Sequence, residues 1–415
     1  MQQSSQLVEH LFRTEYGKLV AILTRIFGTA HIQLAEDMVQ ETLISALDHW
    51  SVSGIPDNPP AWLMQVAKRK ALNELKRNVM MQKHHDQLQP SGNFEIEPVF
   101  LEHEISDSQL RMLFTCCHPS INTESQITLI LKTLCGFGVK EVSRALLTNE
   151  AVIQKRLYRA KKSIRESQLP FGIPGEKELG GRLETVMLSL YLLFNEGYNS
   201  THNDKAIRKD LCLEALRLTH LLKGHFKDQP RLYALLALMC FHAARFEARM
   251  DENQAIILFE DQDRDQWNKE LIHKGAQYLD KSGRGKLLST YHLEASIAAE
   301  HCLAGSFDST NWKELQRLYK ILEKLKPNPL IKLNLAIIQG QLKGADSALE
   351  ALKKLESVNS LSHYHLLPAT QGFFEMKKEN YTSASEYFQK ALALEPSPSE
   401  SKVIIRMIKE FKPKP

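Results

Sequence analysis

The sequence predicts an all-α protein that is divided into several domains. Apolar residues recur at helical spacing along most of the chain, and clusters of Gly, Pro and polar residues interrupt that pattern at two linkers. With 415 residues, the chain is too long for a single typical core, so two or three domains are expected. Its hydrophobic content of 43% and charged content of 25% are those of an ordinary globular protein.

The net charge, the length of the apolar runs and the cysteine pattern exclude several classes of protein. The formal net charge of +4 is small, so any contact with nucleic acid must come from local basic clusters. No apolar run reaches the length of a membrane span and the N-terminus lacks a signal-peptide pattern, so we expect a cytoplasmic protein. The six cysteines form no CxxC pair, and Cys116-Cys117-His118 lacks a second half-site. We therefore expect buried, reduced thiols, and neither a metal nor a cofactor.

Residues 7–49 form two helical patterns that are broken at Gly28. The second helix has an apolar side and, opposite to it, an acidic and amide face that in most proteins is simply solvated. The apolar side comprises Leu34, Met38, Val39, Thr42, Leu43 and Ala46, and the polar face comprises Glu36, Asp37, Gln40 and Glu41. Residues 51–60, SVSGIPDNPP, then form a loop by their Gly, Pro and Asn content.

A basic helix is predicted over residues 61–77, with Pro60 directly before it. Leu63, Val66, Leu72 and Leu75 lie at the spacing of a buried side, with Ala67 between them. The remaining surface carries Lys68, Arg69, Lys70, Asn73, Lys76 and Arg77. Trp62 lies at the junction of loop and helix, where it either stacks on an unstacked base or, as is more usual for a lone tryptophan, anchors the core.

A second basic helix lies within residues 124–166, beyond a linker at 78–106 and a helix at 107–117. Two helices that pack on each other are followed by a tight turn, in which Asn149 can cap the next helix and Glu150 suits its dipole. Residues 151–165 hold six basic and no acidic side chains. This is the pattern of a helix-turn-helix whose second helix enters the major groove, although a solvated basic helix in a bundle has a similar composition.

A further linker at 169–181 precedes a C-terminal half that is helical almost throughout. Residues 330–396 contain a weak repeat, because Ala336, Ala348 and Leu352 recur 36 residues later as Gly372, Ala384 and Phe388. With Ala391 and Pro396, these residues follow the small-small-aromatic-small-Pro order of a tetratricopeptide unit, whose period is about 34 residues. Gln371 and Glu375 match that pattern poorly, so we describe the repeat as tetratricopeptide-like.

Taken together, the two basic helices resemble regions 2 and 4 of the sigma-70 family. Within that family the similarity is to the extracytoplasmic-function group. It rests on the segment AEDMVQETLISAL, the loop after it, the segment WLMQVAKRKALNELKR and the helix-turn-helix. FTCCHPS, LFNEGY, ALMCFHAARFEAR, EDQDRDQW and the closing repeat resemble the subgroup with a C-terminal tetratricopeptide-like extension. The resemblance implies region 2 at 1–80, a linker at 81–106, region 4 at 107–168, a linker at 169–182 and a C-terminal helical domain at 183–415.

The resemblance also implies roles for individual side chains in a protein that directs an enzyme without being one. The clamp coiled coil of core RNA polymerase would meet Asp37, Gln40 and Glu41, the polymerase flap is a second partner, and the 51–60 loop would capture a flipped base. The minus-ten promoter element would meet Trp62, Lys68, Arg69, Asn73 and Arg77. The minus-thirty-five element would meet Gln154, Lys155, Arg156, Arg159 and Lys162. Lys68-Arg69 stands where the family often has Arg-Asn, and Asn73 where it often has Asp, so base preference is open.

The C-terminal half carries the alternatives. Two motifs have either a regulatory or a structural role. The first comprises Phe194, Asn195, Glu196 and Tyr198, and its structural interpretation is a helix end. The second comprises Asp261, Asp263, Arg264 and Trp267, and its structural interpretation is a polar turn closed by an Asp–Arg pair with Trp267 buried. We expect this domain to control the N-terminal part, by docking on it or by sensing a protein partner. A duplex-DNA regulator with a tetratricopeptide sensor is the competing function. An enzyme would have to use scattered groups with no recognisable ligand spacing: His202, Asp204, Glu260, Asp261, Asp263, Asp265 and His292.

Overall fold

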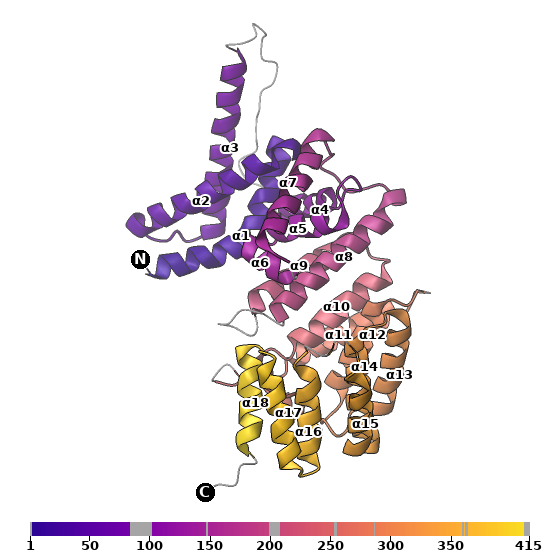
Figure 1. Cartoon of the computed structure of the whole chain (residues 1–415). Coiled ribbons are helices and arrows are strands. Elements are labelled where there is room, and N and C mark those ends of the chain that lie inside the picture. Colours follow the sequence, from indigo (N-terminus) through magenta and orange to yellow (C-terminus); the bar gives the residue numbers. More distant parts are fainter. Residues whose placement is uncertain are drawn as a thin grey trace. The chain divides into compact units, whose positions relative to one another are not determined.

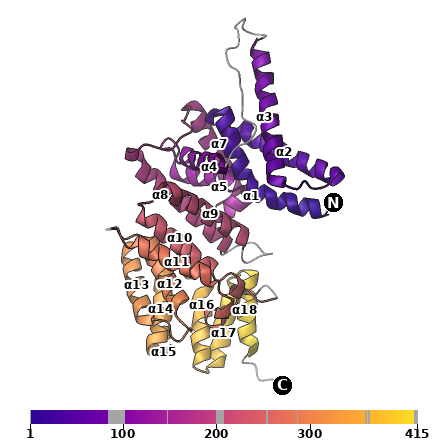
Figure 2. The same ribbon diagram turned by 180° about the vertical axis from the view of Figure 1, so that it is seen from behind.

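The predicted all-α class is confirmed. The computed structural model describes residues 2–83, 102–146, 148–198, 208–252, 255–285, 287–358, 361 and 364–410. Within these ranges it contains eighteen α-helices and no β-strand, only an isolated bridge between Met250 and Ile256. The chain divides into two compact units, Met1–Leu193 and Phe194–Pro415, which Figures 1 and 2 show from opposite sides.

The first unit is built around α1, which packs against α2, α3 and α4. Its buried core includes Tyr16, Leu19 and Ile22 of that helix and Phe114 of α4. The elements are α1 (Gln2–Phe27), η1 (Thr29–His31), α2 (Ile32–Ser53), α3 (Pro59–Lys83), α4 (Glu102–Cys116), α5 (Thr123–Thr133), α6 (Val139–Ala145), α7 (Glu150–Glu166) and α8 (Glu176–Tyr198), whose last turn belongs to the second unit.

The helices extend into both predicted linkers. Because α3 continues to Lys83 and α4 begins at Glu102, both helices reach into the first linker, which was placed at 81–106; residues 84–101 lie outside the described residues. The second linker, placed at 169–182, is helical from Glu176, because α8 runs straight through Gly180 and Gly181. An ion pair between Arg182 and Glu178, one turn apart at 2.9 Å, bridges those glycines.

The second unit is a succession of helices in which each packs on its neighbours in sequence. They are α9 (Lys209–His225), α10 (Pro230–Ala243), η2 (Glu247–Arg249), η3 (Phe259–Asp261), η4 (Arg264–Gln266), α11 (Lys269–Ser282), α12 (Thr290–Leu303), α13 (Trp312–Leu325), α14 (Pro329–Lys343), α15 (Ala345–Leu355), α16 (Leu366–Lys377), α17 (Tyr381–Ala393) and α18 (Pro398–Glu410).

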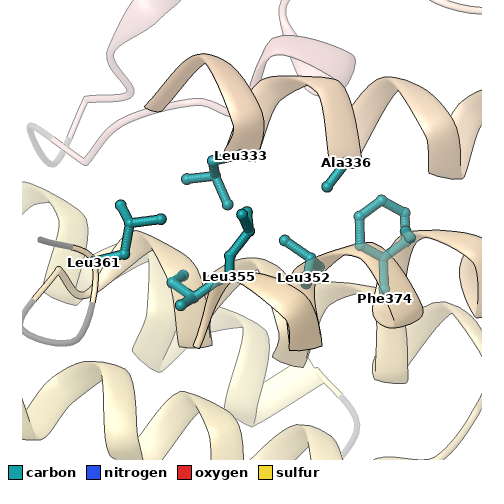
Figure 3. Packing of buried hydrophobic residues seen from close by; sticks show 8 residues of the cluster. Leu333, Ala336, Leu352, Leu355, Leu361 and Phe374 are labelled. Atoms are coloured by element: carbon teal, nitrogen blue, oxygen red, sulfur yellow. The ribbon is translucent and has the colours of Figure 1, made fainter. Parts of the chain in front are cut away.

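The small residues of the predicted repeat lie where these helices cross. A Cβ atom on Gly372 would come within 2.8 Å of the Phe388 ring, and one on Gly340 within 2.5 Å of the Phe374 ring. Ala336, Leu352 and Phe374 meet from α14, α15 and α16 in one cluster (Figure 3). The poorly matching Gln371 is buried and donates to Glu356 Oε1 at 2.7 Å, so a hydrogen bond takes the place of apolar packing. The tetratricopeptide assignment itself stays a prediction.

Two further expectations concern the cysteines and the membrane. All six cysteines are free and buried, as predicted. None of the helices in the described part of the chain combines the length and the apolar character that crossing a membrane would require.

Candidate nucleic-acid interface

One exposed face of helix α2 carries both polar and aliphatic side chains. Asp37, Gln40 and Glu41 are all exposed, and Gln33 Nε2 donates to Asp37 Oδ1 at 3.0 Å. Two apolar side chains continue the same side of the helix, Ile44 with 57% and Leu47 with 38% of their surface exposed. Exposed aliphatic side chains beside carboxylates and an amide are suited to contact another protein.

Glu36 does not belong to that face, and the prediction that placed it there is wrong. Only 2% of its surface is exposed, because helix α7 covers it. Its Oε2 forms an ion pair with the ammonium of Lys161, whose Nζ also donates to Gln33 Oε1 at 2.7 Å. Helical periodicity cannot reveal such a contact, since the partner is 125 residues away.

The loop between α2 and α3 is shorter than expected and is closed by aromatic rings. Because α2 continues to Ser53 and α3 begins at Pro59, the loop comprises only residues 54–58. The ring of Trp62 stacks on His49, with centroids 5.6 Å apart, and meets Trp50 edge-on at 5.3 Å. Trp50 is buried while Trp62 is half-buried, so Trp62 both packs on the core and keeps an accessible surface beside the loop. Val52, with 87% of its surface exposed, lies next to that loop.

Along α3 the exposed side chains form one polar and cationic stripe. Arg69, Asn73 and Arg77 recur at four-residue spacing and are all exposed, with Lys76 beside them. Glu74 Oε1 lies 3.3 Å from Arg77 Nη2, a surface ion pair that contributes little to stability. Lys68 differs from its predicted position: 6% of its surface is exposed, so in this conformation it is not part of the stripe.

Helix α7 begins as predicted and exposes cations along its length. The Asn149 side chain accepts a hydrogen bond from the Val152 amide at 2.9 Å and so caps the helix. Of the residues expected to meet DNA, Gln154, Lys155, Arg159 and Lys162 are exposed. Arg156 is half-buried and forms an ion pair with Glu124 of α5. The opposite side, with Ile153, Leu157, Ala160 and Ile164, is buried.

The segment with α4–α7 packs closely on the first two helices. A Cβ atom on Gly17 of α1 would lie 1.8 Å from the carbonyl oxygen of Leu134, so no side chain fits there. The Thr29 hydroxyl of η1 donates to the Leu169 carbonyl. Burial raises the pKa of Tyr16 far above its usual value, and the charges of Glu36 and Asp37 add to that effect. The first unit is therefore closed, with the basic helix α7 held on α2.

In the second unit the LFNEGY motif has a structural environment. Phe194 and Tyr198 are buried, with ring centroids 6.0 Å apart, and the Arg249 guanidinium lies 3.7 Å from the Tyr198 centroid. A Cβ atom on Gly197 would lie 2.7 Å from Cys212 Sγ, so α8 and α9 approach too closely for a larger residue. Glu196 is buried and Asn195 half-buried. This geometry agrees with the packing interpretation of the motif, and a regulatory role stays a prediction.

The DQDRDQW motif forms a cation–π stack. The Arg264 guanidinium lies 4.4 Å from the centroid of the buried Trp267 and donates to the carbonyl oxygens of His301 and Ala304 at 2.9 and 2.7 Å. The expected Asp–Arg pair is thus replaced by bonds to the backbone. Asp263 instead accepts from the Asp265 amide at 2.9 Å, and Asp261 is exposed.

The groups of the enzyme alternative do not converge where they can be followed. His292 accepts from the Ser289 amide as part of a helix cap, whereas Glu260 pairs with Lys377 at 3.2 Å. Among the residues that the structure describes, no cluster of three or more His, Cys, Asp or Glu could hold a metal ion. His202 and Asp204 lie outside the described residues.

Comparison with known proteins places this interface in a class. Residues 11–79 match Sigma-70 region 2, and residues 182–283 match a family of unknown function, DUF6596. The matched N-terminal segment contains α2, the loop and the stripe on α3, so the chain carries a sigma-70 region 2 domain, which indicates a role in transcription initiation.

The comparisons also identify a relative that covers both units. Uncharacterized protein R00370 of Rhizobium meliloti (strain 1021) is 32% identical over 383 residues, which are 90% of this chain and 89% of that protein. The chain belongs to the same family as that protein. No solved structure matches the chain.

Proposed function

We propose that the protein is a sigma factor of the extracytoplasmic-function group, which binds core RNA polymerase and directs promoter-specific initiation. Helix α2 docks on the clamp coiled coil through Asp37, Gln40 and Glu41, α3 contacts the minus-ten element, and α7 contacts the minus-thirty-five element. The observation that carries the proposal is the exposed stripe of Arg69, Asn73 and Arg77 beside Trp62. It lies inside the segment that matches Sigma-70 region 2.

The physical demands of promoter opening favour this arrangement. Extruding a base costs a few kcal/mol, and stacking on an aromatic side chain returns about 1–3 kcal/mol per base. The accessible part of Trp62 beside a short, exposed loop can supply such stacking. The cationic stripe on α3 then holds the phosphates of the separated strand.

The closed first unit must open before both promoter elements can be contacted. The two elements are about 25 base pairs, or about 85 Å, apart at about 3.4 Å per base pair. In the closed unit the distance between α7 and Trp62 can be estimated along α2. Helix α7 contacts Glu36, Trp62 contacts Trp50, and these two residues of α2 are about 21 Å apart at about 1.5 Å per residue. Because this separation is far too short, polymerase binding would have to release α7 from α2.

Transcription with purified core polymerase tests the proposal. Genomic DNA fragments are transcribed with core polymerase alone or with the full chain added, and the new 5′ ends are sequenced. We expect defined start sites only when the chain is present. Arg69→Ala should lower the yield from those sites by roughly 5- to 150-fold, if the lost contact contributes about 1–3 kcal/mol. The matched control Lys324→Ala removes an exposed cation from the second unit and should leave the yield unchanged.

The competing function, a duplex-DNA regulator with a tetratricopeptide sensor, is distinguished in the same assay. The exposed cations of α7 alone would serve such a regulator, and α3 would not need its stripe. A regulator would give no start sites with core polymerase unless another sigma factor were added. Start sites without that addition therefore exclude it.

For the second unit we propose control over the first, either by docking on it or by sensing a protein partner. Removal of residues 199–415 leaves α8 complete, because that helix ends at Tyr198. Transcription by the shortened chain should differ from that of the full chain. An unchanged yield and unchanged start sites would refute a regulatory role.

A further inference from the structure

The second unit contains a cavity of about 460 Å³, which is within the range of small-molecule sites. It lies between α12, α13, α14, α16 and α18 and the segment that carries η3. Five aromatic side chains line it, namely Phe259, Phe307, Trp312, Tyr319 and Phe373. The Phe307 ring contacts both Trp312 and Phe259, with centroids 5.1 and 6.1 Å apart, so part of this wall is continuous.

A second part of the lining is aliphatic and comes largely from the last helix. Val403, Ile404 and Met407 of α18 line the cavity, together with Ile338 of α14. All four side chains are buried to more than nine-tenths of their surface. An apolar body packed against these side chains would leave water on that side, and this burial would supply the main part of the affinity.

The charged side chains that line the cavity itself are acidic. Two carboxylates, Glu260 and Glu400, line it, and none of the lining residues that the structure describes is a lysine or an arginine. Glu260 Oε2 lies 3.2 Å from Lys377 Nζ, and both side chains remain partly exposed. A cationic ligand would be attracted by both lining carboxylates, whereas the nearest cations, Lys377 and Arg245, lie over the rings of Phe373 and Phe259 and do not themselves line the cavity.

Glu400 is held as a carboxylate by its neighbours. Its Oε2 accepts hydrogen bonds from the Ser397 amide and hydroxyl at 2.9 and 2.6 Å, and its Oε1 lies 3.3 Å from His365 Nε2. Burial acts to raise the pKa of this carboxyl group, but the bonds from His365 and Ser397 lower it to about 2. Burial and nearby arginines lower the pKa of His301 to about 4, so this lining imidazole is neutral near pH 7.

We propose that this cavity binds a small hydrophobic organic cation, an amine with an aromatic or alkyl body. Its body fills the space between the aromatic wall and α18, and its ammonium group is drawn to Glu260 and Glu400. Nothing in this inference depends on the proposed transcriptional role, because it concerns groups of the second unit alone.

Calorimetric titration of the full chain with three matched probes tests the proposal. The probes 4-biphenylmethylamine, 4-biphenylmethanol and biphenyl-4-carboxylate share one apolar body and differ in charge. We expect the amine to bind at least ten times more tightly than the carboxylate, with the alcohol between them. Equal affinities, a preference for the carboxylate, or no binding of the amine at millimolar concentration would overturn the proposal. Polymerase is absent, so the result is separate from that of the transcription assay.

Two variants locate the site. Glu260→Gln preserves volume and should weaken the amine several-fold while leaving the alcohol unchanged, and the control Glu350→Gln, on the exposed face of α15, should change neither. Ala369→Phe fills the cavity and should weaken all three probes. If Ala369→Phe binds like the unmodified chain, the site lies elsewhere and the proposal is wrong. Should that variant fail to fold, the charge-specific loss in Glu260→Gln still decides the matter.

Discussion

Breaking the ion pair between Lys161 and Glu36 should open the first unit. Lys161→Met keeps the length of the side chain but removes the ammonium group from a carboxylate of which only 3% is exposed. Glu36 Oε1 has no hydrogen-bond partner among the described residues, so only the charge of Lys132 would still compensate the carboxylate as long as α7 covers it. Opening would return it to water, and the variant therefore penalises the closed arrangement alone.

The size of the effect follows from burial. Removing one partner of a buried ion pair costs about 3–5 kcal/mol. Because 18% of the Lys161 side chain is exposed, we take the lower end, about 3 kcal/mol, which corresponds to a shift of roughly 150-fold toward the open state. Lys162→Met on the same helix is the matched control. Its ion pair with Glu166 is exposed and 3.7 Å long, so its loss should cost less than about 0.5 kcal/mol.

Energy transfer between dyes on Ser51→Cys and Ser167→Cys measures the opening. Both positions are exposed, and the six native thiols are buried, so labelling is selective. Lys161→Met should increase the population with low transfer, and Glu36→Leu combined with Lys161→Met should restore the closed population because an apolar pair can replace a buried ion pair. Unchanged transfer in Lys161→Met, with both variants folded, would refute the idea that this ion pair closes the unit.

Three further predictions address DNA binding, pH and packing. Arg159→Ala should weaken promoter binding. For about six phosphate contacts, the slope of log affinity against log salt is near −5, and this variant should reduce its magnitude by about one. Fluorescence anisotropy at several salt concentrations measures both effects. The folded-state pKa of His301, about 4, is below the value of about 6.5 expected when unfolded, so its stabilising effect is complete above pH 6.5 and declines below it. His301 should thus contribute a loss of up to about 2 kcal/mol between pH 6.5 and 5 in urea unfolding, in addition to that of His242, whose pKa is lowered to about 3. His301→Phe should reduce the total loss by that amount; a loss equal to that of the unmodified chain would contradict the assignment. Gly372→Ala should destabilise the protein by about 1–3 kcal/mol, because its Cβ would lie 2.8 Å from the Phe388 ring. Gly181→Ala, with open space around it, should stabilise the protein by up to about 1 kcal/mol. Thermal unfolding should therefore give a lower midpoint temperature for the first variant and a higher one for the second.

Local chemistry in the sequence determined the helices and several of their details. The periodicity of apolar residues gave the all-α class, and the cap by Asn149 formed where an amide side chain precedes a basic helix. The segment that resembled region 2 is the one that matches Sigma-70 region 2. Small residues spaced along the repeat lie at helix crossings, because two helices can approach closely only where one of them has a small residue, such as Gly372. The exposed stripe on α3 was also predicted, apart from Lys68.

Tertiary structure alone decided the features that depend on distant partners. Glu36 and Lys68 belong to polar faces by periodicity but are buried, Glu36 because the distant helix α7 covers it. The glycines in α8 suggested a linker, yet the helix continues through them, since packing and an ion pair outweigh a propensity cost of about 1 kcal/mol per glycine. The cavity assembles from residues between Ile256 and Met407, and its two carboxylates, Glu260 and Glu400, line one space only because segments far apart in sequence meet. Spacing along a chain encodes which side of a helix is apolar, but it does not encode which helix will face it.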